Sequence, residues 1–294
     1  MPIEHWDYLR TFLSVLEHGS LSAAARELGL TQPTAGRHIA LLEEQLGHTL
    51  FLRHSGGLLP TEQARAIEPQ ARAMAFAAAA LSRTASGLAG RIEGSVRVSA
   101  SEMVGVEILP DLFAGLQEQH PGLEIELSAS DEVEDLMKRQ ADIAVRMAEP
   151  RQEALLVRHV GTILLGFHAT RAYLDRHGTP QGLEDLRRHR LVGFDRQTAY
   201  IRAMTERFPE AAEVRFSFRA DSNLAQFAAI RAGCGIGFCQ YNLARRHPDL
   251  VPILPRIQLT LPTWVVMHED LKSSPRCRTV FDALVKGLQG HVTR

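Results

Sequence analysis

SLSAAARELGLTQPTAGRHIALLEEQLGHTLFLR, residues 20–53, is the stretch that decides the fold of the N-terminal region. It predicts two short helices that meet at a turn. The first is expected to begin at Ser22, whose hydroxyl can accept from free helix amides, and to end at Gly29, a typical C-cap residue. The second is expected to have Thr31 as its cap and Pro33 in its first turn, and to end at Gly47. Its apolar residues recur at helical spacing: Ala35, Ile39, Leu42 and Leu46.

This pair of helices is a helix-turn-helix pattern, and its second helix has an open polar face. A glutamine can pair with adenine, an arginine with guanine or phosphate, and a threonine with phosphate or a thymine methyl group. A helix of this width fits the major groove of DNA. The alternative is a small helical subdomain without a DNA function. The residues of the open face are Gln32, Thr34, Gly36, Arg37 and His38.

The stretch AAARELGLTQPTAGRHIALLEEQLGHTLFLR resembles the winged helix-turn-helix of LysR-type transcriptional regulators almost position by position. It carries the family's AAA, the threonine-glutamine entry, the arginine of the recognition helix and the LEEQLG-LF-R exit. The resemblance implies a sequence-specific transcriptional regulator, not an enzyme, that binds double-stranded DNA at an interrupted palindrome. The residues expected at the DNA are Ser22, Thr31, Gln32, Pro33, Thr34, Arg37, His38 and Arg53.

Two segments flank this motif. Residues 6–18 predict a supporting helix, because Leu9, Phe12, Leu13 and Leu16 follow helical spacing. Residues 50–53 and 58–60 flank a turn at 54–57 and predict a short hairpin, the wing. The tip, HSGGLL, is less basic than is usual in the family.

Charge and composition limit what the chain can be. The formal net charge is -1, and residues 1–60 hold four arginines, no lysine and six carboxylates. Phosphate affinity must therefore come from the placement of a few groups and from dimerisation. The 294 residues suggest about two domains. No stretch has the pattern of a leader or a membrane span, which predicts a cytoplasmic protein with no membrane partner.

Residues 61–90 are rich in alanine and predict one long linker helix with a heptad seam. One seam position is always alanine and the other is isoleucine, methionine or leucine. In an antiparallel pair, small residues can face large ones, which favours antiparallel pairing with a second copy. The family resemblance implies the same arrangement. The alternative is a core helix packed within its own chain. The seam residues are Ala64, Ile67, Ala71, Met74, Ala78, Leu81, Ala85 and Leu88.

From residue 91 onward, strands and helices alternate, as in α/β proteins. The segments VRVSASEMVGVEILPDLFAGLQEQHPGLEIELSAS and ADIAVRM resemble the family's effector-binding domain. The resemblance implies two lobes, like those of periplasmic solute-binding proteins. The expected layout is a winged helix-turn-helix at 1–60, the linker helix at 61–90 and the effector-binding domain at 91–294. Lobe I is expected at about 91–161 and 266–294, and lobe II at about 162–265.

The effector site is expected beyond the carboxyl ends of the strands and near helix N-termini. Each candidate has a structural alternative: Ser101, Ser222 and Asn223 as helix caps, Arg146 as a member of an ion pair, and His168 and Gln240 as solvated residues. The candidates are Ser99, Ser101, Glu102, Arg146, Met147, His168, Asp195, Thr198, Ser222, Asn223 and Gln240.

These candidates leave the chemistry of the effector open. Arg146 favours an anionic effector, whereas Glu102 favours a mixed-charge molecule such as an amino acid. No GxSxG, P-loop or HExxH motif occurs, the histidines lack metal spacing, and no cofactor is expected. The three cysteines, Cys234, Cys239 and Cys277, fit neither a disulfide framework nor a zinc site. The remaining alternative is a soluble binding protein or an enzyme on the α/β portion, without a DNA function.

Overall fold

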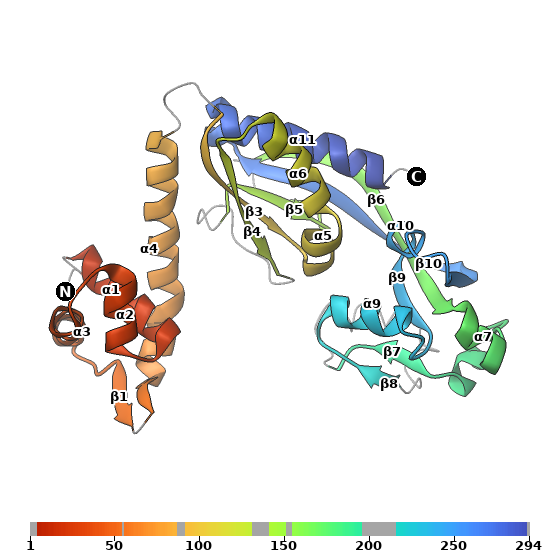
Figure 1. Cartoon of the computed structure of the whole chain (residues 1–294), viewed down its shortest axis with the longest axis horizontal. Helices are drawn as coiled ribbons and strands as arrows, with labels where there is room; N and C mark the ends of the chain where they lie inside the picture. Colours follow the sequence, from red (N-terminus) through yellow and green to blue (C-terminus); the bar gives the residue numbers. More distant parts are fainter. Residues whose placement is uncertain are drawn as a thin grey trace. The chain divides into compact units, whose positions relative to one another are not determined.

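The computed structural model describes residues 5–54, 56–86, 92–130, 141–150, 155–195 and 216–292, although the side chains of 80 and 82–86 are not described. Thr198 and Leu88, and the side chain of Ala85, therefore lie outside the described part. The chain forms two compact units that divide after Ser82, and each is considered by itself (Figure 1).

The N-terminal unit consists of four helices and a two-stranded hairpin. Gly19, Gly29 and Gly47 end the first three helices in the left-handed conformation, with φ of 62°, 66° and 71°. The bounds are α1 Trp6–His18, α2 Leu21–Leu28, α3 Gln32–Leu46, β1 Phe51–His54, β2 Gly57–Pro60 and α4 Glu62–Ser86. The supporting helix, the helix-turn-helix and the wing hairpin are therefore present.

The predicted start of α2 at Ser22 is wrong by two residues. Ser20 is the N-cap, and its hydroxyl accepts from the amide of Ala23 at 3.5 Å. Ser22 is a half-buried residue of the first turn. Both serines can cap a helix, but Ser20 follows Gly19 directly and has the extended conformation that an N-cap requires. The cap at Thr31 is as expected, because its hydroxyl accepts from the amide of Thr34 at 3.3 Å.

The core of this unit includes the first part of α4. Ala64 is 0% exposed and Ala71 is 3% exposed, and both pack with the buried residues of α1, α2 and α3. The assignment of Ala64 to an interface with a second copy is therefore wrong. Ala71 also belongs to the chain's own core. The heptad spacing is real, but at this end of α4 the apolar face is covered by the same chain.

The second unit contains a six-stranded sheet in the order β4-β3-β5-β10-β6-β9. Strand β3 is parallel to both β4 and β5. Helices α5 and α6 follow β3 in the chain and contact β4, and α11 packs on β3, β6 and β10 (Figure 1). The bounds are β3 Gly94–Ala100, α5 Glu102–Glu107, α6 Leu109–Gln119, β4 Leu123–Ala129, β5 Ile143–Arg146, β6 Leu155–Thr170, β9 Gly237–Gln240, β10 Leu250–His268 and α11 Pro275–Val292.

Most of the remaining described elements of the second unit form a second lobe around the far ends of β6 and β10. A parallel pair, β7 and β8, joins this lobe through a bridge between Leu191 and Ile236. The bounds are α7 Arg171–His177, η3 Glu184–Arg188, β7 Leu191–Gly193, β8 Phe216–Arg219, α9 Asn223–Arg231, α10 Tyr241–Ala244 and η5 Glu269–Ser273, the last of which follows β10 in the first lobe.

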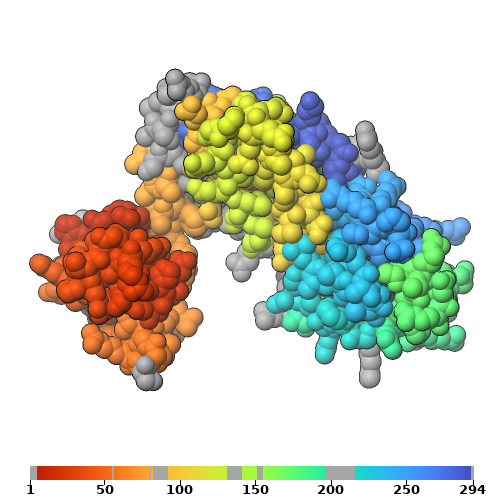
Figure 2. Space-filling view, in the orientation of Figure 1, coloured from red at the N-terminus to blue at the C-terminus, as the bar shows by residue number. Residues whose placement is uncertain are grey.

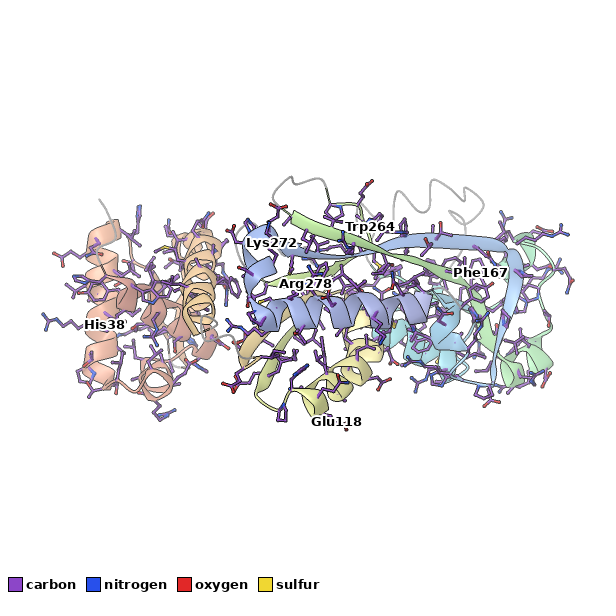
Figure 3. All side chains as sticks on the ribbon, turned by 90° about the horizontal axis from the view of Figure 1, so that it is seen from above. His38, Glu118, Phe167, Trp264, Lys272 and Arg278 are labelled. Carbon is purple, nitrogen blue, oxygen red and sulfur yellow. The ribbon has the colours of Figure 1, made fainter. Side chains whose placement is uncertain are left out.

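The two lobes share the long antiparallel strands β6 and β10. On one side, β5 pairs with β10 at residues 264–267, and on the other, β9 pairs with β6 at residues 165–168. Between these stretches, residues 161–164 of β6 pair with residues 260–263 of β10. This two-stranded connector, 161–164 and 260–263, is the strand connection between the lobes. Trp264 and Phe167 mark the first-lobe and second-lobe sides of it (Figure 3). The predicted two-lobed α/β architecture is confirmed.

Candidate nucleic-acid interface and effector site

Helix α3 presents a polar face to solvent because its apolar residues are buried under it. Ala35 and Leu42 are fully buried and Ile39 is 6% exposed, whereas Gln32 and Arg37 are exposed. At the start of the helix, the hydroxyls of Thr31 and Thr34 lie 2.8 Å apart and Pro33 is exposed. The first turn of α3 is therefore open, capped and able to approach a polyanion.

His38 lies on the same helix (Figure 3), and its ring contacts Thr11 and Tyr8 of α1. Its Nδ1 is 2.8 Å from the hydroxyl of Thr11, and its ring centroid is 5.1 Å from that of Tyr8. The Thr11 hydroxyl donates to the carbonyl of Asp7 at 2.9 Å, so His38 Nδ1–H donates to Thr11. This arrangement leaves Nε2 as the ring atom for an outside partner. Sequence reasoning missed Thr11, whose signal is a hydroxyl inside an apolar helix stripe.

Replacing Thr11 with valine should therefore remove the hydrogen bond to His38 and leave the packing of the core unchanged. Valine has a similar shape but removes the hydroxyl that accepts from His38, so the ring loses its fixed orientation. We expect a loss of about 0.5–1.5 kcal/mol in unfolding free energy. The loss of the fixed tautomer would appear in NMR spectra as a change in the chemical shifts of the His38 ring nitrogens. Unchanged shifts would contradict the role of Thr11.

The wing is hydrogen-bonded to the residue that ends α1 and to helix α3. The amide of Leu58 donates to the carbonyl of Gly19 at 2.8 Å, and Glu43 Oε1 accepts from the amides of Leu50 and Phe51. On the hairpin itself, Arg53 and His54 are exposed, and the paired Leu52 and Leu59 are 57% and 51% exposed. The wing therefore offers one permanent cation and an apolar pair.

Two of the acidic residues that made this region formally acidic have internal partners. Glu43 accepts the two wing amides, and Glu27 accepts from the Ser14 hydroxyl and lies 3.1 Å from His18 Nε2. The Ser14 hydrogen bond and the neighbouring His18 lower the pKa of Glu27, while burial opposes them. These carboxylates join elements of the unit, which explains why they coexist with the open, capped first turn of α3.

The lowered pKa of Glu27 predicts a pH dependence of stability. A carboxyl group with a depressed folded-state pKa stabilises the fold above its unfolded-state pKa and loses that effect as the pH falls through the folded-state value. We expect Glu27→Gln to lower the unfolding free energy by at most about 1 kcal/mol at pH 7, because the pair is partly exposed. Denaturant titrations should show this difference shrinking below about pH 4.5. A difference that does not shrink as the pH falls below about 4.5 would contradict the assignment.

In the second unit, the structure brings Ser99 and Arg146 together. Ser99 lies on β3 and is 1% exposed, and Arg146 ends the neighbouring strand β5. Arg146 Nη1 donates to the Ser99 hydroxyl at 3.1 Å. Met147, the next residue, has its sulfur 3.3 Å from the hydroxyl of Thr263 on β10. The end of these strands is therefore a polar site with one guanidinium group.

Glu102 and Ser222 form a second pair of candidates that meet. The Ser222 hydroxyl donates to Glu102 Oε2 at 2.9 Å and accepts from the amide of Ala225 at 3.2 Å, so Ser222 is the N-cap of α9. Asn223 is the first residue of that helix and not its cap. Ser101 stands at the N-cap position of α5 but makes no side-chain cap hydrogen bond, so the cap interpretation holds for Ser222 and is wrong for Ser101.

The other effector-site candidates that the structure describes, His168, Gln240 and Asp195, belong to neither of these two pairs. His168 and Gln240 are 1% and 6% exposed, so the alternative that they are solvated is wrong. His168 Nδ1 is 2.9 Å from the carbonyl of Gly166, and its ring packs edge-on against Tyr241. Burial lowers the pKa of His168, and the hydrogen bond to Gly166 opposes this in part. Asp195, which follows β7, is exposed.

Two absences apply to the described part of the chain. Among its residues, no group of three or more histidine, cysteine or carboxylate side chains is placed to hold a metal ion. No helix in the described ranges is long and apolar enough to cross a membrane. Within the same ranges, Gln240 Oε1 and the hydroxyl of Tyr241 are buried without a hydrogen-bond partner.

Comparison with known proteins identifies the class. Residues 6–65 match the family described as the bacterial regulatory helix-turn-helix protein, lysR family, and residues 89–289 match the LysR substrate binding domain. The chain belongs to the LysR family of regulators. Both of its expected parts, the helix-turn-helix and the domain for a small molecule, are confirmed at the level of the family.

Individual relatives agree with this. The HTH-type transcriptional regulator CrgA of Neisseria meningitidis serogroup C is 27% identical over 286 residues, which cover 95% of this chain and 96% of the relative. The solved structure of CrgA has a TM-score of 0.59 at 26% identity and covers 96% of this chain and 98% of that chain. The full-length structure of CbnR with its target DNA has a TM-score of 0.66 at 21% identity, covering 96% and 99%, and shows the fold alone.

Proposed function

We propose that this chain is a transcriptional regulator in which α3 reads double-stranded DNA and a small molecule between the two lobes controls the reading. The observation that carries the proposal is the polar face of α3, where Gln32 and Arg37 are exposed above the buried Ala35 and Leu42. Such a face fits the major groove. Family membership supports it, and CbnR, which shares the fold, has been solved in complex with its target DNA. Because the chromosome is the target, the protein works in the cytoplasm.

The proposed DNA contacts differ with the exposure and the position of each side chain. Gln32, Thr34 and Arg37 read base edges or phosphates, and Arg53 on the wing meets phosphate. Thr31 and Pro33 fix the start of α3, so that its free amides face phosphate. His38 contributes Nε2 only. Ser22 lies in the first turn of α2, where it can meet backbone phosphate.

Dimerisation is proposed to use the part of α4 that its own chain leaves open. Met74 is 45% exposed and Leu81 is 70% exposed. An antiparallel pairing centred on Phe76 places Met74 of one copy opposite Ala78 of the other, and Leu81 opposite Ala71. Each large side chain then meets an alanine, as close packing favours.

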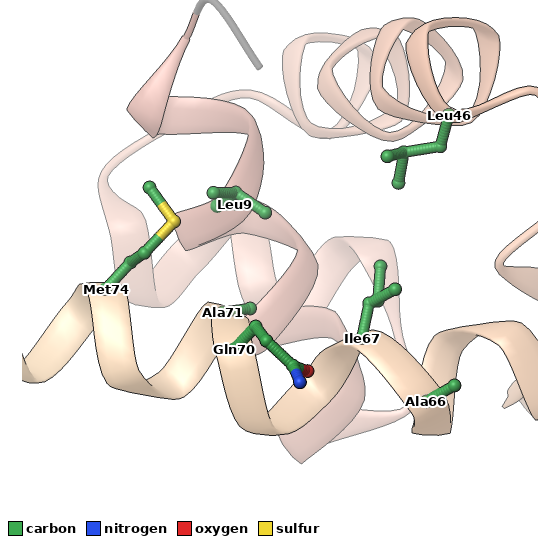
Figure 4. Close-up of a pocket in the computed structure, with 7 residues that line it drawn as sticks. All are labelled: Leu9, Leu46, Ala66, Ile67, Gln70, Ala71 and Met74. Atoms are coloured by element: carbon green, nitrogen blue, oxygen red, sulfur yellow. The ribbon is translucent and has the colours of Figure 1, made fainter. Parts of the chain in front are cut away.

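A groove in the N-terminal unit fits this register (Figure 4). It has a volume of about 330 Å³ and lies between α4 and the helices above it. Ala71 is only 3% exposed and forms part of the groove wall, so the register places the partner's Leu81 in the groove beside it and not on an open face of Ala71. A leucine that leaves water for this groove gains about 1.5–3 kcal/mol. The lining residues are Leu9, Leu46, Ala66, Ile67, Gln70, Ala71 and Met74.

A two-fold pair of copies presents two α3 helices, so the expected target is an interrupted palindrome, read by a homodimer or by a dimer of dimers. We assign residues 1–60 to the DNA-binding domain, 61–90 to the linker helix and 91–294 to the effector-binding domain. The proposed lobe limits, 91–161 with 266–294 and 162–265, cross β6 and β10 within or beside the two-stranded connector.

The proposed effector site is at the ends of β3 and β5, where Arg146 and Ser99 meet. A guanidinium group at this edge favours an anionic or carboxylate-bearing molecule, and Glu102 nearby keeps a mixed-charge molecule open. Isothermal titration with a panel of small carboxylates and amino acids tests this. Binding that is lost in Arg146→Ala but kept in the surface variant Arg158→Ala supports the site, and binding that ignores Arg146 contradicts it.

The DNA function is tested by mapping the genomic sites that the full-length chain occupies. We expect a small number of sites that share an interrupted palindrome, and specific gel retardation of those sites. Uniform binding along the genome, or no retention of DNA, would contradict the proposal. Genes beside the sites then indicate the effector.

A further inference from the structure

Helix α5 is bonded to the second lobe at both of its ends. At its start, Glu102 Oε2 accepts from the Ser222 hydroxyl at 2.9 Å. At its end, the carbonyl of Glu107 accepts from Arg246 Nη1 at 2.7 Å, and Arg246 lies 4.0 Å from Asp111 of the next helix. Arg246 follows α10 and Ser222 caps α9, both in the second lobe. The yellow α5 and the cyan α9 adjoin in the space-filling view (Figure 2).

The hydrogen bond between Ser222 and Glu102 has a fixed direction. The Ser222 oxygen accepts from the amide of Ala225, so its single proton goes to the Glu102 carboxylate. The bond is charge-assisted and lies at the N-terminus of the nine-residue α9, where the helix dipole favours a negative charge. Glu102 therefore occupies the position where an external anion would be attracted.

The covalent path between the lobes leaves room for movement at this contact. Only the pairing of β6 with β10 crosses from lobe to lobe within the described sheet, and its register shifts between Thr263 and Trp264. A two-stranded ribbon twists more easily than a wide sheet. The contacts of α5 with α9 and Arg246 lie outside this ribbon, so they oppose rotation of one lobe against the other.

We propose that Glu102 and Ser222 form an interlobe latch, which holds the two lobes in the observed arrangement. The latch gives the two lobes one defined arrangement, and a ligand that takes the N-terminus of α9 from Glu102 releases it. The second statement rests on the proposed function, because it assumes that the effector binds at this edge of the lobes. The first statement concerns the chain alone.

The test compares variants that keep the cap of α9 and change only the latch. Ser222→Asp still accepts from the Ala225 amide, because aspartate is a good N-cap, but it cannot donate to Glu102 and places a second carboxylate beside it. In the double variant Ser222→Asp with Glu102→Gln, the amide of the glutamine can donate to the aspartate. Glu118→Gln on α6 removes a charge from the exposed surface of the first lobe (Figure 3) and is the matched control.

Hydrogen exchange of the full-length protein, followed by mass spectrometry, gives the readout at α5 and α9. We expect Ser222→Asp to raise the exchange rate of α5 amides about tenfold, and the double variant to return it to within about twofold of the wild type. The control should match the wild type. Unchanged exchange in Ser222→Asp, or a double variant that stays as fast as the single one, would overturn the latch.

The regulatory statement has a separate readout. Without added small molecule, Ser222→Asp should change the affinity for the mapped operator at least threefold, and the double variant should restore it. A loosened α5 with unchanged operator affinity would overturn the regulatory role of the latch. Failure of the wild type to bind any operator would count against the proposed function instead, while the exchange experiment would still decide whether the latch exists.

Discussion

Arg37→Ala is expected to weaken operator binding by about 1–3 kcal/mol for each α3 that contacts the DNA. The side chain is exposed in the middle of α3, on the face opposite Ala35 and Ile39. A bidentate contact to guanine would be lost together with its sequence information, because alanine offers no donor. Fluorescence anisotropy with the mapped operator and with single-base variants of it measures both effects.

The salt dependence separates the two roles of Arg37. If the guanidinium group reads a base, the variant loses discrimination at one position of each half-site. If it meets phosphate alone, affinity falls for every sequence and the salt slope decreases by about one unit per contact. Arg72→Ala is the control, since it removes an exposed arginine from α4 that pairs with Glu68. Unchanged binding by Arg37→Ala would contradict both roles.

Met74→Glu combined with Leu81→Glu is expected to convert the dimer into monomers. Both side chains are exposed in the single chain, so the substitutions leave its core intact. In the pair, they would place four carboxylates in an apolar seam, which costs several kcal/mol. Sedimentation velocity should show the monomer mass, and circular dichroism should show an unchanged helix content at about 25 °C. Ala79→Glu, on another face of α4, is the control and should remain dimeric.

The register itself has a sharper test. If Met74 faces Ala78 of the partner, then Met74→Glu should weaken the dimer, and adding Ala78→Lys should restore it through two symmetric ion pairs. Operator affinity should follow the dimer, because two half-sites are read together. A dimer that survives Met74→Glu with Leu81→Glu would remove α4 from the interface, and failed rescue would contradict the register centred on Phe76.

The ends of the N-terminal helices could be predicted because local chemistry sets them. Gly19, Gly29 and Gly47 adopt the left-handed conformation that glycine takes at little cost. The start of α2 is harder to predict because two serines stand two residues apart, and the choice depends on the backbone after Gly19. Local sequence offers both caps, and the structure uses Ser20.

The seam of α4 shows what periodicity leaves open. A heptad pattern identifies an apolar face, but it does not identify the chain that covers it. Ala64 and Ala71 are covered by α1 and its neighbours, while Met74 and Leu81 stay exposed. The difference arises from the size of the helix-turn-helix, which reaches only the first turns of α4.

In the second unit, the sequence identifies candidate residues for the site, but it does not show which of them contact one another. Ser99 with Arg146, and Glu102 with Ser222, are separated by 47 and 120 positions in the chain. Strand order and lobe contact bring these pairs together, and a single sequence does not contain that information. His168 is polar and therefore open to a solvated interpretation, but strand β6 places it inside the lobe.

The central claim is that α3 gives this chain sequence-specific DNA binding. The most direct measurement is the ratio of affinities for the mapped operator and for a scrambled duplex of equal length, at one fixed salt concentration. A specific regulator should prefer its operator by about 10³-fold or more, and Arg37→Ala should reduce that ratio. Equal affinities for the two duplexes, unchanged by the substitution, would contradict the claim.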